Sequence, residues 1–161
     1  MPARRIAVRF LPGCRGRVPA DELRRVARRV LDDEHVAPAV EVEVVLADVA
    51  TSRDLNRLYR GRDEPADVLS FAAHEGEAFI EAPDAAPSLG EVVICLAVLE
   101  SRASAAGRPV AGEVAHLLVH GLLHLLGHDH ELGETQSAAM QAREDALLAS
   151  LGYDGQYAHG H

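Results

Sequence analysis

The chain has 161 residues, 48% of them hydrophobic, which suits one compact domain with a single core. Its two cysteines are too few for a disulfide framework, and no apolar run approaches the roughly 20 residues that span a bilayer. The first residues lack the apolar segment of a secretory signal, so we expect a cytoplasmic protein with no membrane partner. We expect one domain over residues 1–152 and a disordered tail over residues 153–161.

Charge is divided unevenly along the chain. Residues 1–62 hold 13 arginines and 9 acidic residues (+4), whereas residues 63–161 hold 3 arginines and 16 acidic residues (−13), which sum to the net charge of −9. A net acidic protein is a poor non-specific binder of nucleic acid, although the arginine-rich half could still present a basic surface to phosphates. The alternative is that the arginines at positions 24, 25, 28 and 29 only form a solvated helix face.

Hydrophobic periodicity, caps and turn residues predict an α+β fold. The patterns predict, in chain order, a strand over 5–10, a helix over 19–31, a strand over 40–46, a helix from a cap at Thr51 or Ser52 to about Tyr59, a strand over 68–71, a surface loop over 75–88, a strand over 91–95, and helices over 97–106, 110–126 and 135–151. The helix over 110–126 is apolar around its whole circumference, which indicates a buried central helix. We therefore expect a single domain in which a small, mostly four-stranded sheet packs with helices around this central helix.

The central helix carries a histidine pattern that predicts a metal site. His120 and His124 are four residues apart, so on a helix they share one face. Gly127 can end the helix in a left-handed conformation, after which His130 can return toward the first two histidines. Three neutral imidazoles suit Zn²⁺ and leave a fourth position for water, which is typical of catalytic zinc sites.

The same spacing occurs in the metzincin proteases, with one departure. Those helices carry a glutamate directly after the first histidine, as the general base of peptide hydrolysis, and this chain has Gly121 there. The histidine pattern therefore leaves metallopeptidase as a less favoured candidate function.

Two further residues are candidates for contacts behind the ligands. Asp129 lies beside His130, and a carboxylate there could orient an imidazole by accepting its other N–H, or could cap the turn. His116 lies one helical turn before His120, either as a similar partner or, as we favour, in a structural role.

Three blocks of the sequence resemble the YbeY family of bacterial endoribonucleases and rRNA maturation factors. The run from His120 to His130, H-G-L-L-H-L-L-G-H-D-H, is similar to the family's H-G-x-L-H-L-x-G-Y-D-H. The run from Leu55 to Phe71, L-N-R-L-Y-R-G-R-D-E-P-A-D-V-L-S-F, is similar to L-N-x-x-Y-R-x-x-D-x-P-T-D-V-L-S-F. A strand at 89–95 and a tail that includes Met140, Glu144 and Leu151 also fit. The departures are Ala66 for Thr, Glu91 for Asp, Cys95 for Ser and His128 for Tyr.

The resemblance implies a zincin-like YbeY fold and a zinc-dependent endoribonuclease. The implied role is cleavage of single-stranded rRNA during maturation of the 3′ end of small-subunit rRNA and in ribosome quality control, with the ribosome or its associated proteins as partners. Zinc would lower the pKa of a bound water toward about 7 and polarise a phosphoryl oxygen. Arg60, in the second block, is the candidate catalytic residue, because its planar fork can donate two parallel hydrogen bonds to a phosphate. The identity of the general base stays open, as does a third candidate function, a non-catalytic ribosome-assembly factor in which zinc only holds the fold.

Overall fold

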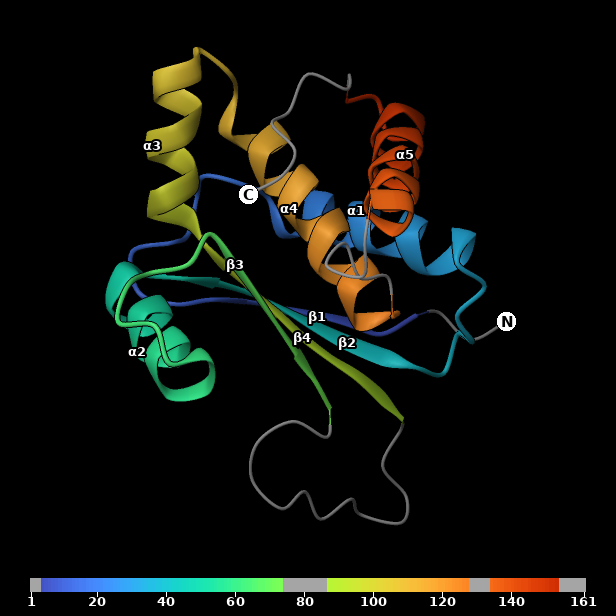
Figure 1. Cartoon of the computed structure of the whole chain (residues 1–161), viewed down its shortest axis with the longest axis horizontal. Coiled ribbons are helices and arrows are strands. Elements are labelled where there is room, and N and C mark those ends of the chain that lie inside the picture. Colours follow the sequence, from blue (N-terminus) through green and yellow to red (C-terminus); the bar gives the residue numbers. More distant parts are fainter. Residues whose placement is uncertain (1–3, 74–86, 128–133, 154–161) are drawn as a thin grey trace.

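A four-stranded mixed sheet forms the centre of the protein. The computed structural model describes residues 4–73, 87–127 and 134–153. The strands are β1 (Ile6–Phe10), β2 (Glu41–Ala47), β3 (Val68–Ala72) and β4 (Ser88–Cys95), in the order β1-β2-β4-β3. β1, β2 and β4 are parallel, and β3 pairs antiparallel with β4 and forms one edge (Figure 1).

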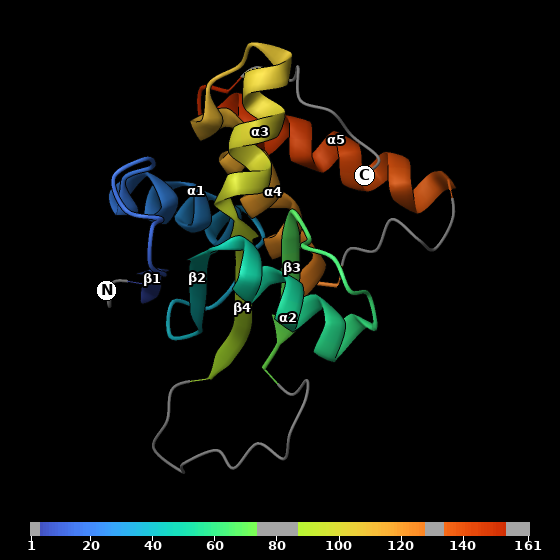
Figure 2. The same cartoon turned by 90° about the vertical axis from the view of Figure 1, so that its left-hand side faces the viewer.

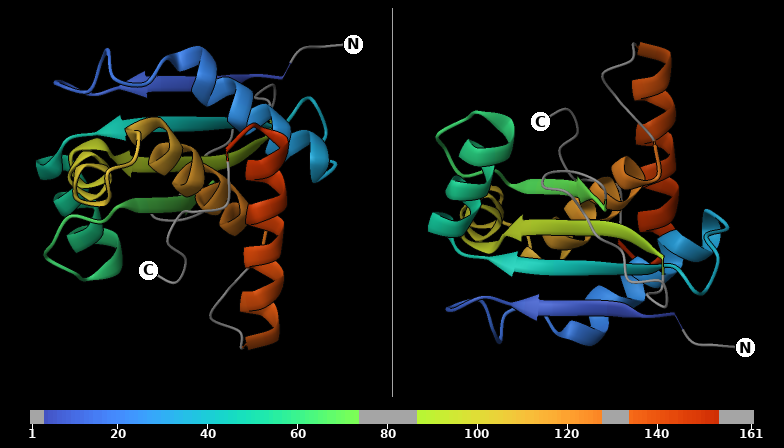
Figure 3. Two further views of the ribbon diagram at one scale, coloured as in Figure 1. Left: turned by 90° about the horizontal axis from the view of Figure 1, so that it is seen from above. Right: turned by 90° about the horizontal axis from the view of Figure 1, so that it is seen from below.

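Helices cover the two faces of the sheet unequally. On one face lie α1 (Ala20–Asp33), α3 (Leu96–Ala106), α4 (Val110–Leu125) and α5 (Glu134–Ser150), and their apolar residues share one core with Val42, Val44 and Ile94 of the sheet. Among the described residues, the helix on the other face is α2 (Val49–Arg60), which packs over a small cluster that includes Val45 and Phe71 (Figure 3). Both α2 and α3 lie at the end of the sheet where β2 and β4 finish (Figure 2).

α4 is the central helix, as its sequence predicts. It packs against β3 and β4 as well as α1, α3 and α5, and Leu117, Leu118 and Leu122 are almost fully buried. The predicted α+β fold, with a four-stranded sheet around one apolar helix, is confirmed. None of the helices in the described ranges is long and apolar enough to cross a membrane.

The start of α2 differs from the sequence prediction. Asp48 caps this helix in place of Thr51 or Ser52: its carboxylate accepts the backbone N–H of Thr51 at 3.3 Å and the hydroxyl of Thr51 at 2.7 Å. The buried Ser52 instead donates its hydroxyl to the carbonyl of Ala66, 3.0 Å away. Ser52 is therefore unavailable as a cap, because its hydroxyl bonds to the chain just before β3.

The folded part of the chain extends beyond the predicted boundary at residue 152. Tyr153 packs against the core, and its hydroxyl donates to the carboxylate of Glu22 on α1. Arg25 of the same helix donates to the carbonyl of Leu151 at 2.9 Å. The other residues of the predicted tail, 154–161, lie outside the described ranges.

Candidate functional site

His120 and His124 lie one turn apart on α4, with ring centroids 4.7 Å apart. His120 keeps 24% of its side-chain surface accessible, although most of α4 is buried. Gly127 has φ +96°, so the helix ends there in the conformation that the sequence predicts. The other two residues of the pattern, His130 and Asp129, lie outside the described residues. Within the described residues, no group of three or more His, Cys, Asp or Glu side chains could hold a metal ion.

A buried carboxylate forms a hydrogen bond with one ring nitrogen of His120. Glu144 of α5 has 2% of its side chain exposed, and one carboxylate oxygen, Oε1, is 2.5 Å from Nδ1 of His120. The other oxygen, Oε2, is 3.3 Å from Nε2 of the buried His116. With Nδ1–H donating to Glu144, the lone pair of the neutral His120 ring lies on Nε2, on the side away from α5.

Glu144 is ionised in this arrangement. Burial alone would raise its pKa, but the hydrogen bonds from His116 and His120 and their electrostatic attraction to the carboxylate outweigh burial and lower the pKa from 4.5 to about 2. Because the folded-state pKa lies below the ordinary value, the ionised group stabilises the folded state above pH 4.5. This contribution is lost as the pH falls from 4.5 toward about 2.

The sequence alone assigned no role to Glu144 and favoured Asp129 as the carboxylate that orients a metal-binding imidazole. The sequence nevertheless contains a pattern that indicates a buried contact of Glu144. Met140, Glu144 and Leu147 follow helical spacing along one face of α5, Leu151 continues the spacing just past the helix end, and all four are buried. A glutamate within an apolar stripe is rarely buried unless a partner pairs with it, so it indicates a specific contact.

Replacing Glu144 with glutamine is expected to weaken zinc binding about 10- to 100-fold, because an amide can accept a hydrogen bond from only one of the two imidazoles. Zinc affinity measured by competition with a chelator checks this. In the metal-free protein, the variant should also lose part of the stability difference between about pH 7 and about pH 3. Glu34→Gln is the matched control, since it removes the ion pair of Glu34 with Arg143, the neighbour of Glu144 on α5. Equal zinc affinity of the two variants would contradict this role of Glu144.

Gly121 lies on the face of α4 that packs tightly against the sheet. A Cβ atom there would be 2.7 Å from Cγ1 of Val92 and 3.2 Å from Cγ2 of Val68. The hydroxyl of Ser70 donates to the carbonyl of Gly121 at 3.0 Å, which ties β3 to the helix. The position that carries glutamate in metzincins is therefore turned into the sheet and has no room for a side chain.

Gly121→Ala is expected to destabilise the protein by about 1–3 kcal/mol, because the added methyl group must displace side chains of two strands. Thermal unfolding measures the effect. The matched control is Ala105→Ser on the exposed surface of α3, which should change the melting temperature little. An unchanged melting temperature for Gly121→Ala would show that the helix can move away from the sheet at no cost.

Arg60 lies at the β3 edge of the sheet. Its Nη2 donates to the carbonyl of Ser70 at 2.9 Å, its Nη1 donates to the carbonyl of Tyr59 at 3.1 Å, and its guanidinium carbon lies 5.0 Å from the ring centre of Phe71. These contacts fix the orientation of an exposed arginine. Through Ser70, the structure connects Arg60 to the backbone of Gly121, the neighbour of His120.

Most arginines of the N-terminal half are paired with carboxylates, so the expected basic surface is largely neutralised. Arg28 and Arg29 are exposed on α1, as predicted for a solvated helix face. The ion pairs join Arg4 to Asp32, Arg5 to Glu41, Arg9 to Glu43, Arg17 to Glu100, Arg24 to Asp21, Arg25 to Glu22, Arg53 to Asp63, Arg57 to Asp54 and Arg62 to Glu64.

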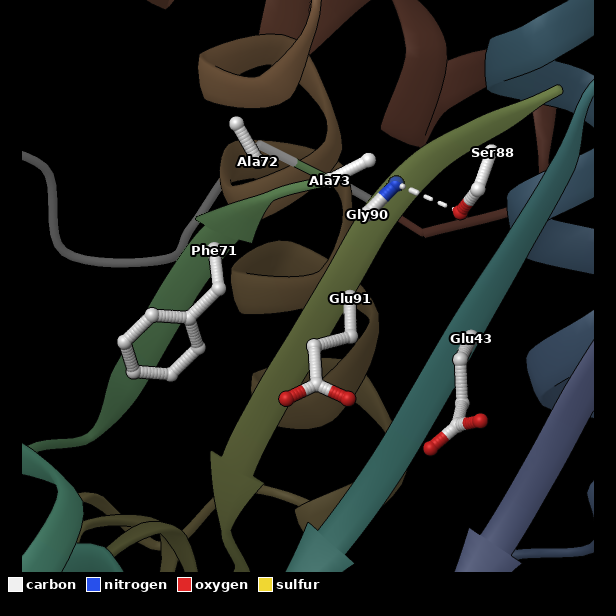
Figure 4. A pocket seen from close by; sticks show the side chains of 7 residues that line it. All are labelled: Glu43, Phe71, Ala72, Ala73, Ser88, Gly90 and Glu91. Atoms are coloured by element: carbon white, nitrogen blue, oxygen red, sulfur yellow. Dashed lines mark hydrogen bonds between the residues drawn. The ribbon is translucent and has the colours of Figure 1, made fainter. Parts of the chain in front are cut away.

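A cavity of about 260 Å³ lies on the face of the sheet opposite α4 (Figure 4). Glu43 and Glu91 project into it beside Phe71. Burial raises the pKa of Glu91, and the charge of Glu43 raises it further. Two carboxylates repel phosphate, so this cavity is a poor site for a nucleic-acid backbone.

Comparison with known proteins identifies the family. The model of the family described as Endoribonuclease YbeY matches residues 15–152. The chain belongs to the YbeY family. It is 40% identical to the endoribonuclease YbeY of Roseiflexus castenholzii over 147 residues, which cover 91% of this chain and 92% of that protein. It is 43% identical to the endoribonuclease YbeY of Pelotomaculum thermopropionicum over 141 residues, 84% of this chain and 91% of that protein.

A solved structure has a similar fold. The solution structure of TM1509 from Thermotoga maritima matches with a TM-score of 0.60 and covers 91% of this chain and 88% of that one. At 23% identity this likeness concerns the fold alone. The resemblance seen in the sequence blocks is confirmed, and the family consists of endoribonucleases.

Proposed function

We propose that this protein is a zinc-dependent endoribonuclease that cleaves single-stranded RNA. The family and its endoribonuclease relatives support nuclease activity on RNA. Its proposed setting is the cytoplasm, in association with the ribosome, with rRNA maturation at the 3′ end of the small-subunit rRNA and ribosome quality control as its roles.

The hydrogen bond between Glu144 and His120 is the observation that carries the proposal. A carboxylate behind an imidazole fixes the tautomer and raises the basicity of the opposite nitrogen, which is how metal-binding histidines are usually held. His120, His124 and His130 would hold the ion, and three nitrogen donors suit zinc, although nickel also binds such sites. His116 would position Glu144.

Zinc, when bound, supplies a Lewis acid for the phosphoryl group and activates water. The chain itself supplies orientation and positive charge. Arg60 would donate N–H bonds to the non-bridging phosphoryl oxygens, where negative charge grows as the phosphodiester is cleaved. Its contacts with Ser70, Tyr59 and Phe71 hold the guanidinium in place before the substrate binds.

The packing of Gly121 argues against a metallopeptidase. The general base of the metzincins would have to project from this position, and Val92 and Val68 fill the space. The third candidate function is that of a ribosome-assembly factor in which zinc only holds the fold. In that case chelation should unfold the protein, and purified samples should lack nuclease activity.

Cleavage of a labelled single-stranded RNA, a matched duplex and casein tests the proposal. The zinc-loaded protein should cleave only the single-stranded RNA, a chelator should stop cleavage, and added zinc should restore it. Circular dichroism of the chelated protein should show a folded chain. Cleavage that resists chelation, or cleavage of casein alone, would contradict the proposal.

A further inference from the structure

Tyr59 is an aromatic residue that the fold leaves accessible. It is the last residue but one of α2, and 45% of it is exposed. Its ring contacts that of Phe71, with ring centroids 5.3 Å apart and planes inclined by 66°. Phe71 itself is buried.

The guanidinium of Arg60 packs on the same aromatic ring, that of Phe71. Its guanidinium carbon lies 5.0 Å from the ring centre of Phe71, and two backbone carbonyls hold its N–H groups. Tyr59 and Arg60 are therefore two flat groups, both anchored by Phe71 and both exposed.

These groups are connected to α4 through the edge strand β3, although α2 and α4 lie on opposite faces of the sheet. Arg60 donates to the carbonyl of Ser70, and the hydroxyl of Ser70 donates to the carbonyl of Gly121 on α4. Gly121 is the residue that follows His120.

We propose that Tyr59 and Arg60 form a stacking platform for a base of the RNA strand. This inference rests on the proposed function, since it assigns a subsite to that substrate. Proteins that bind single strands stack unpaired bases on aromatic rings and arginine planes, whereas the bases of a duplex are already stacked on one another. The platform therefore gives a physical reason for selecting single-stranded RNA, and it holds the strand while Arg60 reaches the phosphate.

A fluorescent reporter tests the platform directly, because the chain contains no tryptophan. Tyr59→Trp places a single indole on the platform, and Leu58→Trp places one on the adjacent residue, which is 66% exposed. A short single-stranded oligonucleotide should quench the fluorescence of Tyr59→Trp and not of Leu58→Trp. The same strand without bases should leave both unchanged. Equal quenching of the two reporters, or quenching by the strand without bases, would overturn the proposal.

Kinetics provide the second test. Tyr59→Ala should raise KM for single-stranded RNA about 10-fold, as expected for one lost stacked base, with a much smaller change in kcat. Tyr59→Phe should restore KM, because the ring and not the hydroxyl stacks, and Leu58→Ala should behave as the wild type. An unchanged KM for Tyr59→Ala would overturn the platform while the nuclease proposal stands. If the wild type does not cleave RNA, the proposed function fails and the fluorescence result still decides whether bases stack on Tyr59.

Discussion

Replacing Arg60 with alanine should lower kcat for RNA cleavage about 10²- to 10³-fold and leave zinc binding unchanged. A prepositioned donor directed at a developing charge has effects of this size, because it needs no reorganisation during the reaction. Arg60 contacts the carbonyls of Tyr59 and Ser70 and the ring of Phe71, which belong to α2 and β3. The variant should therefore keep the histidine site intact.

Single-turnover cleavage and zinc analysis of the same preparations measure this effect. Arg60→Lys keeps the charge but loses the planar fork, so it should recover only a small part of the rate. Arg57→Ala is the matched control, since Arg57 lies nearly one turn earlier on α2 and pairs with Asp54 at the surface. Cleavage by Arg60→Ala at the wild-type rate would remove Arg60 from the mechanism.

Replacing His120 or His124 with alanine should abolish RNA cleavage and strongly weaken zinc binding. A lost ligand should weaken zinc binding more than the roughly 10- to 100-fold that is typical of lost supporting contacts behind a ligand. His120→Ala also removes a hydrogen bond from the buried carboxylate of Glu144, so it should unfold more easily than the wild type in the metal-free state.

Zinc content, cleavage and thermal unfolding of both variants check these expectations. His35→Asn is the control histidine substitution: His35 is exposed just after α1, and asparagine tolerates its φ of 59°. The wild type and all variants should be purified in parallel, because contaminating ribonucleases differ between preparations. A variant of His120 that lacks zinc and still cleaves RNA would contradict the proposed role of the metal.

Local patterns in the sequence were sufficient to predict the helices and strands, including the buried central helix. Alternating Val and Glu residues predict β2, and the apolar circumference of residues 110–126 predicts the buried α4. Gly127 ends the helix as expected, because its positive φ is a local property. These features depend on neighbours within a few residues, so one sequence contains their signal.

Contacts between distant segments were the features that the sequence did not reveal. Glu144 and His120 are 24 residues apart in sequence and lie on different helices. The packing of α5 on α4 brings the two side chains together. The absence of a side chain at Gly121 has a reason only once β3 and β4 lie against α4. Likewise, the positive charge of residues 1–62 suggested a basic surface, whereas folding places acidic partners beside most of those arginines.

X-ray absorption spectroscopy of the zinc-loaded protein is the most direct test of the metal centre. The proposal predicts one zinc ion per chain with three imidazole nitrogens at about 2.0–2.1 Å, and two imidazoles in His124→Ala at saturating zinc. Glu144→Gln should keep the same three ligands and bind the ion less tightly. A protein that retains no zinc, or a zinc ion bound through cysteine sulfur or with its imidazole count unchanged in His124→Ala, would contradict it.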